Sequence, residues 1–187
     1  MKYPSPTDIA EMKACGYDPL TIAEAEQQSK RWNRAQQVAV AIEAAFLGVT
    51  LGRGIGLQEA QGLDDYEDAG TRASYRDNDE KDDWHRITPE ALNRCNSSLS
   101  FFDAEGMRFH LPAYLLADLR GEYGFGMAFC LTHLSDHTLN QFVLLSSKQR
   151  AAIRAFLLHI GDDPDYEFDR PHIVRALNEC WTESDSI

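Results

Sequence analysis

Three residues that can bind metal lie close together in the second half of the chain. Cys130, His133 and His137 have the spacing C-x2-H-x3-H, and Asp136 directly precedes the second histidine. Thiolate and imidazole suit zinc, and one helical turn would bring the three side chains to one face. This spacing predicts a metal-dependent hydrolase with an acid such as Asp136 as base. The competing interpretation is a core thiol beside surface imidazoles, because Leu134 replaces the glutamate of the His-Glu-x-x-His motif.

A glycine-rich segment and several aspartate pairs offer further candidate chemistry. Residues 52–56 read Gly-Arg-Gly-Ile-Gly, and free amides ahead of a helix can hold phosphate. No Lys-Ser/Thr pair follows, so a connector between helices is the better interpretation. The pairs at 64–65, 82–83 and 162–163 lie in polar surroundings, whereas catalytic carboxylates need a rigid, partly desolvated setting. No Gly-x-Ser-x-Gly motif occurs, and we expect neither a catalytic residue nor a cofactor.

The strongest chemical signal is a run of acids. Segment 64–83 holds nine acidic and three basic side chains, a net charge of −6 out of −12 for the whole chain. Few apolar residues interrupt it, so we expect a surface loop or a weak helix. An anionic surface speeds encounter with a basic partner, and a few aromatic or arginine anchors supply affinity. The residues expected to bind a partner protein are Asp64, Asp65, Tyr66, Glu67, Asp68, Tyr75, Asp79, Glu80, Asp82, Asp83, Trp84 and Arg108.

Composition narrows the class of partner and the compartment. The 187 residues carry 30 acidic and 18 basic side chains. This balance argues against nucleic acid and membranes as partners, since both need an excess of Lys and Arg. No stretch approaches the ~20 apolar residues that span a bilayer, and no export signal precedes the first helix. Four scattered cysteines without a C-x-x-C pair fit the reducing cytoplasm. We therefore expect a cytoplasmic protein, either a monomer or a small homo-oligomer.

The elements that must position these residues are mainly helical. Apolar residues spaced by three and four predict a long helix from Asp18-Pro19 to about residue 47. A capping box over Ser146–Gln149 predicts another that buries Ile153 and Phe156. Further helices are expected over residues 57–63 and 89–93, from Pro112 onward, and after Asp169.

Residues 99–110 predict a β-hairpin. Leu99–Phe102 and Met107–His110 flank a turn in which Gly106 would take the left-handed position. Arg108 would then lie at the edge of a binding groove, and the hairpin edge could pair with a second copy. Weaker strand patterns over residues 127–131 and 142–145 extend the sheet. The expected fold class is α+β, a mainly helical single domain over residues 1–187 with a small antiparallel sheet.

This hairpin segment also resembles a known family. Residues 102–119 read FDAEGMRFHLPAYLLADL, similar to the F-x-D-x-x-G-x-R-F-x-L-P-A-Y motif of an uncharacterised bacterial domain-of-unknown-function family. The likeness extends over residues 35–160, with Met107 where an aromatic residue is more usual. The resemblance implies no enzymatic activity, and it associates the chain with immunity proteins encoded beside secreted toxins. The resulting expectation is a non-enzymatic immunity protein that neutralises a cognate toxin with a basic surface.

Overall fold

Helices form every regular element in the part of the chain that the structure describes, residues 4–182 of a computed structural model. Within that range, no helix combines the length and hydrophobicity needed to cross a bilayer. The α-helices are α1 (Pro6–Ala14), α2 (Pro19–Ala45), α3 (Leu57–Asp64), α4 (Ala69–Asn78), α5 (Pro89–Arg94), α6 (Ala104–Leu119), α7 (Ala128–Thr132), α8 (Asp136–Gln141), α9 (Ser147–Gly161) and α10 (Arg170–Glu179). The 3-10 helices are η1 (Trp84–Arg86), η2 (Ser98–Ser100) and η3 (Pro164–Tyr166).

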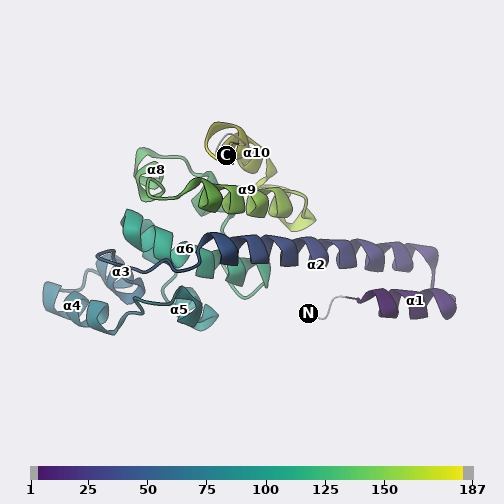
Figure 1. The fold of residues 1–187 in the computed structure, drawn as a ribbon, viewed down its shortest axis with the longest axis horizontal. Coiled ribbons are helices and arrows are strands. Elements are labelled where there is room, and N and C mark those ends of the chain that lie inside the picture. The colour runs from purple at the N-terminus through teal and green to yellow at the C-terminus, as the bar shows by residue number, and fades with distance from the viewer. Residues whose placement is uncertain (1–3, 183–187) are drawn as a thin grey trace.

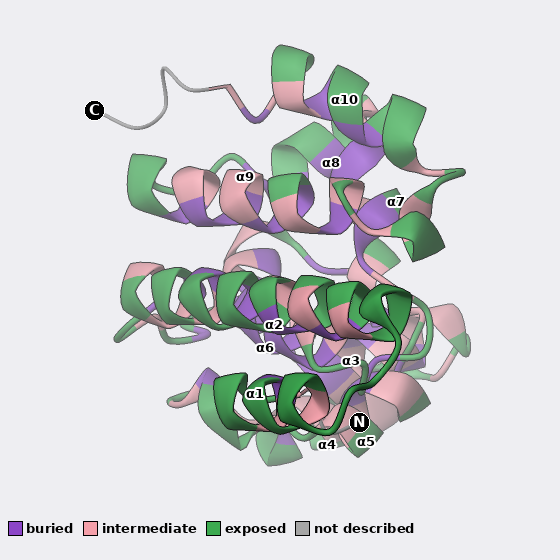
Figure 2. Ribbon diagram, turned by 90° about the vertical axis from the view of Figure 1, so that its right-hand side faces the viewer, coloured by how far each residue is buried: buried purple, intermediate pink, exposed green. Residues whose placement is uncertain are grey.

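Helix α2 is the long axis of the molecule (Figure 1). Helix α9 packs along one side of it, while α6 packs against another (Figure 2). Helices α7 and α10 contact each other beside α9, and α3 and α4 pair at the opposite end of the fold from α10 (Figure 1). The first turns of α2, with α1 alongside, extend beyond the other helices. Arg31 and Arg34 on α2 bind the end of α9 through Asp162 and Asp163.

The predicted long helix and its neighbours are confirmed where caps and apolar spacing agree. The Asp18 carboxylate accepts the amides of Leu20 and Thr21, and Pro19 occupies the first helical position of α2. The capping box of Ser146 and Gln149 opens α9 as expected. The predicted short helices correspond to α3, α5 and α10.

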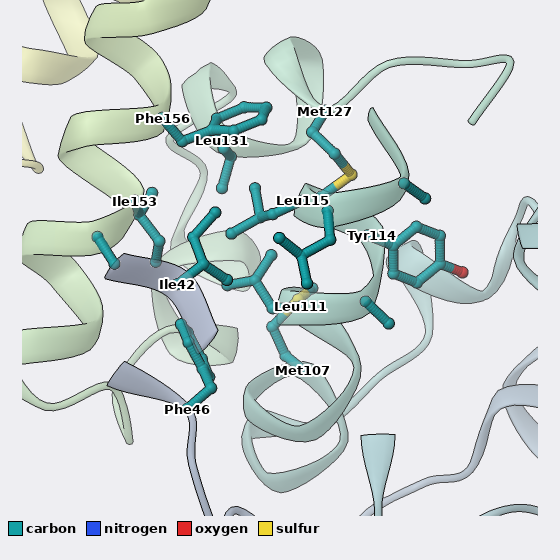
Figure 3. Close-up of a cluster of buried hydrophobic side chains, with 14 of the residues drawn as sticks. Ile42, Phe46, Met107, Leu111, Tyr114, Leu115, Met127, Leu131, Ile153 and Phe156 are labelled. Carbon is teal, nitrogen blue, oxygen red and sulfur yellow. The ribbon is translucent and has the colours of Figure 1, made fainter. Parts of the chain in front are cut away.

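The core collects around α6, which is buried on almost all sides. Side chains of α2, α9 and α7 interdigitate with it (Figure 3). Residues of this cluster have at most 1% of their surface exposed: Ile42, Phe46, Met107, Leu111, Tyr114, Leu115, Met127, Leu131, Ile153 and Phe156. Because this helix contacts α2, α5, α8 and η1, it fixes the positions of elements far apart in sequence.

The predicted hairpin over residues 99–110 is wrong. Asp103, expected in a β-turn, instead caps α6 and accepts the amide of Gly106 at 2.8 Å. Met107, Phe109 and His110 are buried and Arg108 is half-buried, because this helix lies in the centre of the fold and has no polar stripe. Its sequence pattern therefore does not distinguish a helix from a strand. The described chain is therefore all-helical rather than α+β. The hairpin edge that could have paired with a second copy does not exist.

The two further strands predicted over residues 127–131 and 142–145 are also wrong. Helix α7 occupies the first segment, and a turn between α8 and α9 occupies the second. Both are short apolar runs, in which periodicity does not separate a buried strand from one buried helical turn. No strand remains within residues 4–182.

The glycine-rich segment 52–56 packs directly on the N-terminus of α6. The amides of Arg53 and Ile55 donate to the carboxylates of Glu105 and Asp103, each at 3.0 Å. A Cβ atom on Gly54 would lie 2.5 Å from the backbone nitrogen of Gly106. The amides that a phosphate would need are thus bound to carboxylates, and the glycines serve close backbone packing.

Candidate functional site

The acidic segment 64–83 forms an ordered surface at one end of the molecule. It contains the end of α3, a turn at Tyr66, all of α4, and the loop that leads to η1. Helix α4 has no buried residue and packs against α3 at the edge of the fold (Figure 1). We call the exposed side of α3, α4 and this loop the acidic surface.

One acid of the segment, Asp79, is buried and holds α3 in place. Only 8% of its surface is exposed. Its carboxylate accepts the amides of Gln58 at 2.9 Å and Glu59 at 3.1 Å, the first free donors of α3. Burial raises the pKa of this carboxyl, and the two amide bonds oppose that shift. Gly56 lies so close that a Cβ atom there would overlap the carboxylate.

Three further acids bind backbone amides near their own positions. Asp68 caps α4 by accepting from Gly70 at 2.7 Å and Thr71 at 3.0 Å. Glu80 accepts the amides of residues 81–83, and Asp83 accepts the amide of the second residue after it. Hydrogen bonds lower the pKa of each of these three carboxyls. These acids therefore stabilise the local backbone.

The other five acids of the segment cap no backbone amide and reach solvent. They are Asp64, Asp65, Glu67, Asp77 and Asp82. Asp77 was not among the residues singled out from the sequence, although its place in the charge run was a sufficient signal. These five carboxylates give the acidic surface its accessible negative charge.

The aromatic residues predicted as anchors have different environments. Tyr66 is 95% exposed, whereas Trp84 is 2% exposed and donates its Nε1–H to the carbonyl of Phe46 at 3.0 Å. Tyr75 is half-buried, with its ring beside Gly62. Trp84 is thus a core residue, and Tyr66 is the aromatic side chain that a partner can reach.

Tyr66 also has an unusual backbone. Its φ of 57° is the only positive value at a non-glycine residue within residues 4–182. The amides of Tyr66 and Glu67 donate to the carbonyls of Leu63 and Gly62, the pattern of a Schellman motif, whose left-handed position is usually glycine. The left-handed conformation costs a non-glycine residue about 1 to 2 kcal/mol. The chain thus holds an exposed tyrosine at a position where glycine would be more stable.

Arg108 lies on α6 and not on a strand. It is half-buried, its Nε is buried without a hydrogen-bond partner, and no ion pair joins it to segment 64–83 in the described structure. Arg108 was predicted to lie at the edge of a groove only because a hairpin was expected there. Since no hairpin forms in this described segment, that prediction is wrong.

Cys130, His133 and His137 line one pocket but do not form a metal site. Helix α7 ends at Thr132, before the first histidine, so no continuous helical face carries all three. His133 stacks on Phe129, and His137 Nε2 lies 3.0 Å from a backbone carbonyl oxygen. Burial raises the pKa of Cys130 to about 12, which disfavours the thiolate that zinc binds. Among the residues described, no three His, Cys, Asp or Glu side chains are placed to hold a metal ion.

Comparison with known proteins identifies the family of the chain. The sequence model of a family of unknown function, DUF6714, matches residues 34–185. The chain belongs to the DUF6714 family. No curated protein and no solved structure matches it.

The DUF6714 match contains the whole acidic surface, the glycine-rich segment and α6. It begins within α2, so that α1 and the first turns of α2 precede it. These preceding turns are the part that extends beyond the other helices (Figure 1). The family itself carries no assigned activity, so any function must be argued from the site.

Proposed function

We propose that this DUF6714 member is a non-enzymatic binding module whose acidic surface docks on a basic partner protein. The observation that carries the proposal is Tyr66, a fully exposed aromatic residue in a left-handed turn between α3 and α4. Exposed residues held in costly backbone conformations cluster at functional sites. Tyrosine is also enriched among the residues that dominate binding energy at interfaces.

Charge around Tyr66 supports the same conclusion. Asp64, Asp65 and Glu67 lie within two residues of it, and Asp77 and Asp82 add accessible carboxylates on α4 and the following loop. Such a surface accelerates encounter with a positively charged protein and orients it, while the aromatic anchor slows dissociation. Binding and not catalysis is favoured because neither candidate for chemistry, the Cys130 pocket or the glycine-rich segment, has the required geometry.

The most specific form of the proposal is a cytoplasmic immunity protein that neutralises a cognate toxin. It is supported by the association of small bacterial proteins of this kind with secreted toxins and by the acidity of the surface, which suits a basic toxin domain. The product of the adjacent gene is the candidate partner. Co-expression of the two proteins should restore growth to cells that the partner alone inhibits.

The key variant is Tyr66→Gly. We expect it to raise the free energy of unfolding by roughly 0.5 to 1 kcal/mol, because glycine removes the left-handed strain but adds entropy to the unfolded chain. The same change should weaken partner binding at least about tenfold, as loss of an anchor does. Urea unfolding and isothermal titration calorimetry measure the two effects. A variant that is stabilised yet binds normally would contradict the role of Tyr66.

Charge reversal tests whether the negative charge of the acidic surface speeds association with the partner protein. The variant Asp65→Lys, Asp77→Lys, Asp82→Lys should lower the association rate about tenfold or more at low salt, and high salt should shrink this loss.

A matched control reverses three exposed acids outside the segment with the same change in net charge. Suitable residues are Glu24, Glu122 and Glu167. Equal losses in both triple variants would reject the acidic surface as the docking site. Absence of both a complex and growth protection would reject the immunity proposal.

A further inference from the structure

His110 is a completely buried histidine with one unused nitrogen. The residue lies on α6 with no exposed surface, and its ring stacks on Phe102 with centroids 4.3 Å apart. Nδ1 lies 2.7 Å from the carbonyl oxygen of Gly106 on the same helix. A carbonyl only accepts, so Nδ1 carries the proton and Nε2 is left with a lone pair. Nε2 is buried and has no hydrogen-bond partner in the described structure.

The ring of His110 lines a cavity with a volume of about 130 Å³. The apolar part of its wall comes from Leu57, Ile87 and Ala91. A second buried polar group on the wall is the Asp79 carboxylate. Because Nδ1 is bound to the backbone of α6, Nε2 is the polar ring atom whose hydrogen-bonding capacity stays unused at this residue of the cavity wall. The buried part of the cavity therefore presents two hydrogen-bond acceptors, one of them a carboxylate.

The exposed part of the same cavity is cationic. Arg86 has a side chain that is 70% exposed, and Arg94 is exposed as well. Glu80 also lines the wall, but its Oε1 accepts three backbone amides. Its Oε2 and the Oδ2 of Asp83 each lie 3.8 Å from Arg86, whereas Arg94 has no ion pair within the described structure. Acceptors at the buried end and guanidinium groups at the open end define a site with two opposite polarities.

We propose that this cavity binds a small zwitterion, with a primary ammonium group at the buried acceptors His110 Nε2 and Asp79 and a carboxylate at Arg86 and Arg94. An ammonium group has three donors and no acceptor, which suits the free lone pair of His110 Nε2 and the remaining lone pairs of the Asp79 carboxylate, whose oxygens already accept the amides of Gln58 and Glu59. Guanidinium groups recognise carboxylates at the open end. Leu57, Ile87 and Ala91 line the short hydrocarbon between the two charges. Ammonium carboxylates of this size are small amino acids.

This inference is independent of the partner-binding proposal, since the site uses neither Tyr66 nor the exposed acids of the segment. The length of the ligand is found with a series of ω-amino acids, from glycine to 5-aminopentanoate. Calorimetry measures affinity, and long-range proton–nitrogen NMR follows the His110 Nε2 resonance. We expect one member to bind and to move that resonance as a hydrogen bond forms. The n-alkylamine and the n-alkylcarboxylate of the same length should each bind at least about tenfold more weakly.

Two variants test the site itself. His110→Phe keeps an aromatic ring against Phe102 but removes the Nε2 acceptor, and it should weaken binding at least about tenfold. His172→Phe makes the same change at an exposed histidine outside the cavity and should bind as the wild type does. The NMR spectrum of each variant verifies that it is folded.

Three results would overturn the inference. One is a series in which no member moves the Nε2 resonance, which would mean that the cavity holds water only. Another is equal binding of the zwitterion, the amine and the carboxylate. The third is an equal loss of affinity in both histidine variants.

Discussion

Acidification is expected to destabilise this protein through His110. Burial, opposed by the hydrogen bond to Gly106 and by the charge of Asp103, lowers the pKa of this histidine from 6.5 to about 4. In the unfolded chain the imidazole regains its ordinary pKa, so between these two values the unfolded state binds more protons than the folded state. The free energy of unfolding therefore falls as the pH falls through this window. The contribution of neutral His110 to the free energy of unfolding is complete above its ordinary pKa of 6.5, and it is lost as the pH approaches the folded-state pKa of about 4.

The size of the effect follows from the two pKa values. The difference between the pKa values of His110 in the unfolded and folded states corresponds to about 3 kcal/mol of unfolding free energy. About 2 kcal/mol of this stability is already lost at pH 5. His110→Phe isolates this contribution, because phenylalanine keeps an aromatic ring against Phe102 but does not titrate. It also replaces an unpartnered buried nitrogen by carbon, so its stability at pH 7 should be close to that of the wild type. At pH 5 the variant should be the more stable protein by about 2 kcal/mol.

Urea unfolding across this pH range, followed by circular dichroism, measures the effect. The decisive quantity is the difference in unfolding free energy between the wild type and His110→Phe. His172→Phe is the matched control, because it makes the same substitution at a histidine that is exposed on α10. The difference in unfolding free energy between the two proteins should change from pH 7 to pH 5. If it stays constant, His110 is not a buried, neutral imidazole.

Three other substitutions or modifications test individual contacts. Gly54→Ala should lower the free energy of unfolding by about 1 to 3 kcal/mol in urea titrations, because its methyl group would meet the backbone of Gly106 at 2.5 Å. Asp68→Ala should cost about 1 kcal/mol through loss of the α4 cap, measured in the same way. Iodoacetamide should modify the exposed Cys15 far faster than Cys130, whose pKa burial raises to about 12; equal rates by mass spectrometry would contradict that burial.

The helices that the sequence predicted correctly have one polar face. In α2, Ala35, Val38 and Ile42 form a buried stripe beside exposed residues, and a cap marks the start. Helix α9 has the same combination. Helix α6 lacks this contrast between a buried and an exposed face, because the fourteen consecutive residues from Gly106 to Leu119 are all buried or half-buried. Pro112 misled further, since proline usually marks the first turn of a helix, whereas here it lies inside one that began at Ala104.

The candidate site was predictable as a region but not residue by residue. The charge run located the acidic surface, because like charges concentrated over twenty residues must meet solvent. Trp84 follows two aspartates, a position compatible with a core or a surface side chain, and the structure places it in the core. The left-handed turn at Tyr66 was also missed, although its position just after a short helix is where glycine is expected. Sequence pattern gives average exposure, whereas the proposed function depends on which side chain a turn directs outward.

The acids of segment 64–83 divide by what they bind, and this division determines how their function can be tested. Asp68, Asp79, Glu80 and Asp83 hold backbone amides, so neutralising them removes caps as well as charge. A loss of binding in such variants would be indistinguishable from local unfolding of α3, α4 or the loop. The five solvent-facing acids have no such role, and their reversal changes the surface potential while the caps stay intact. The proposed electrostatic docking and the observed capping therefore involve different acids of one charge run, and only the acids that cap no backbone amide can report on docking.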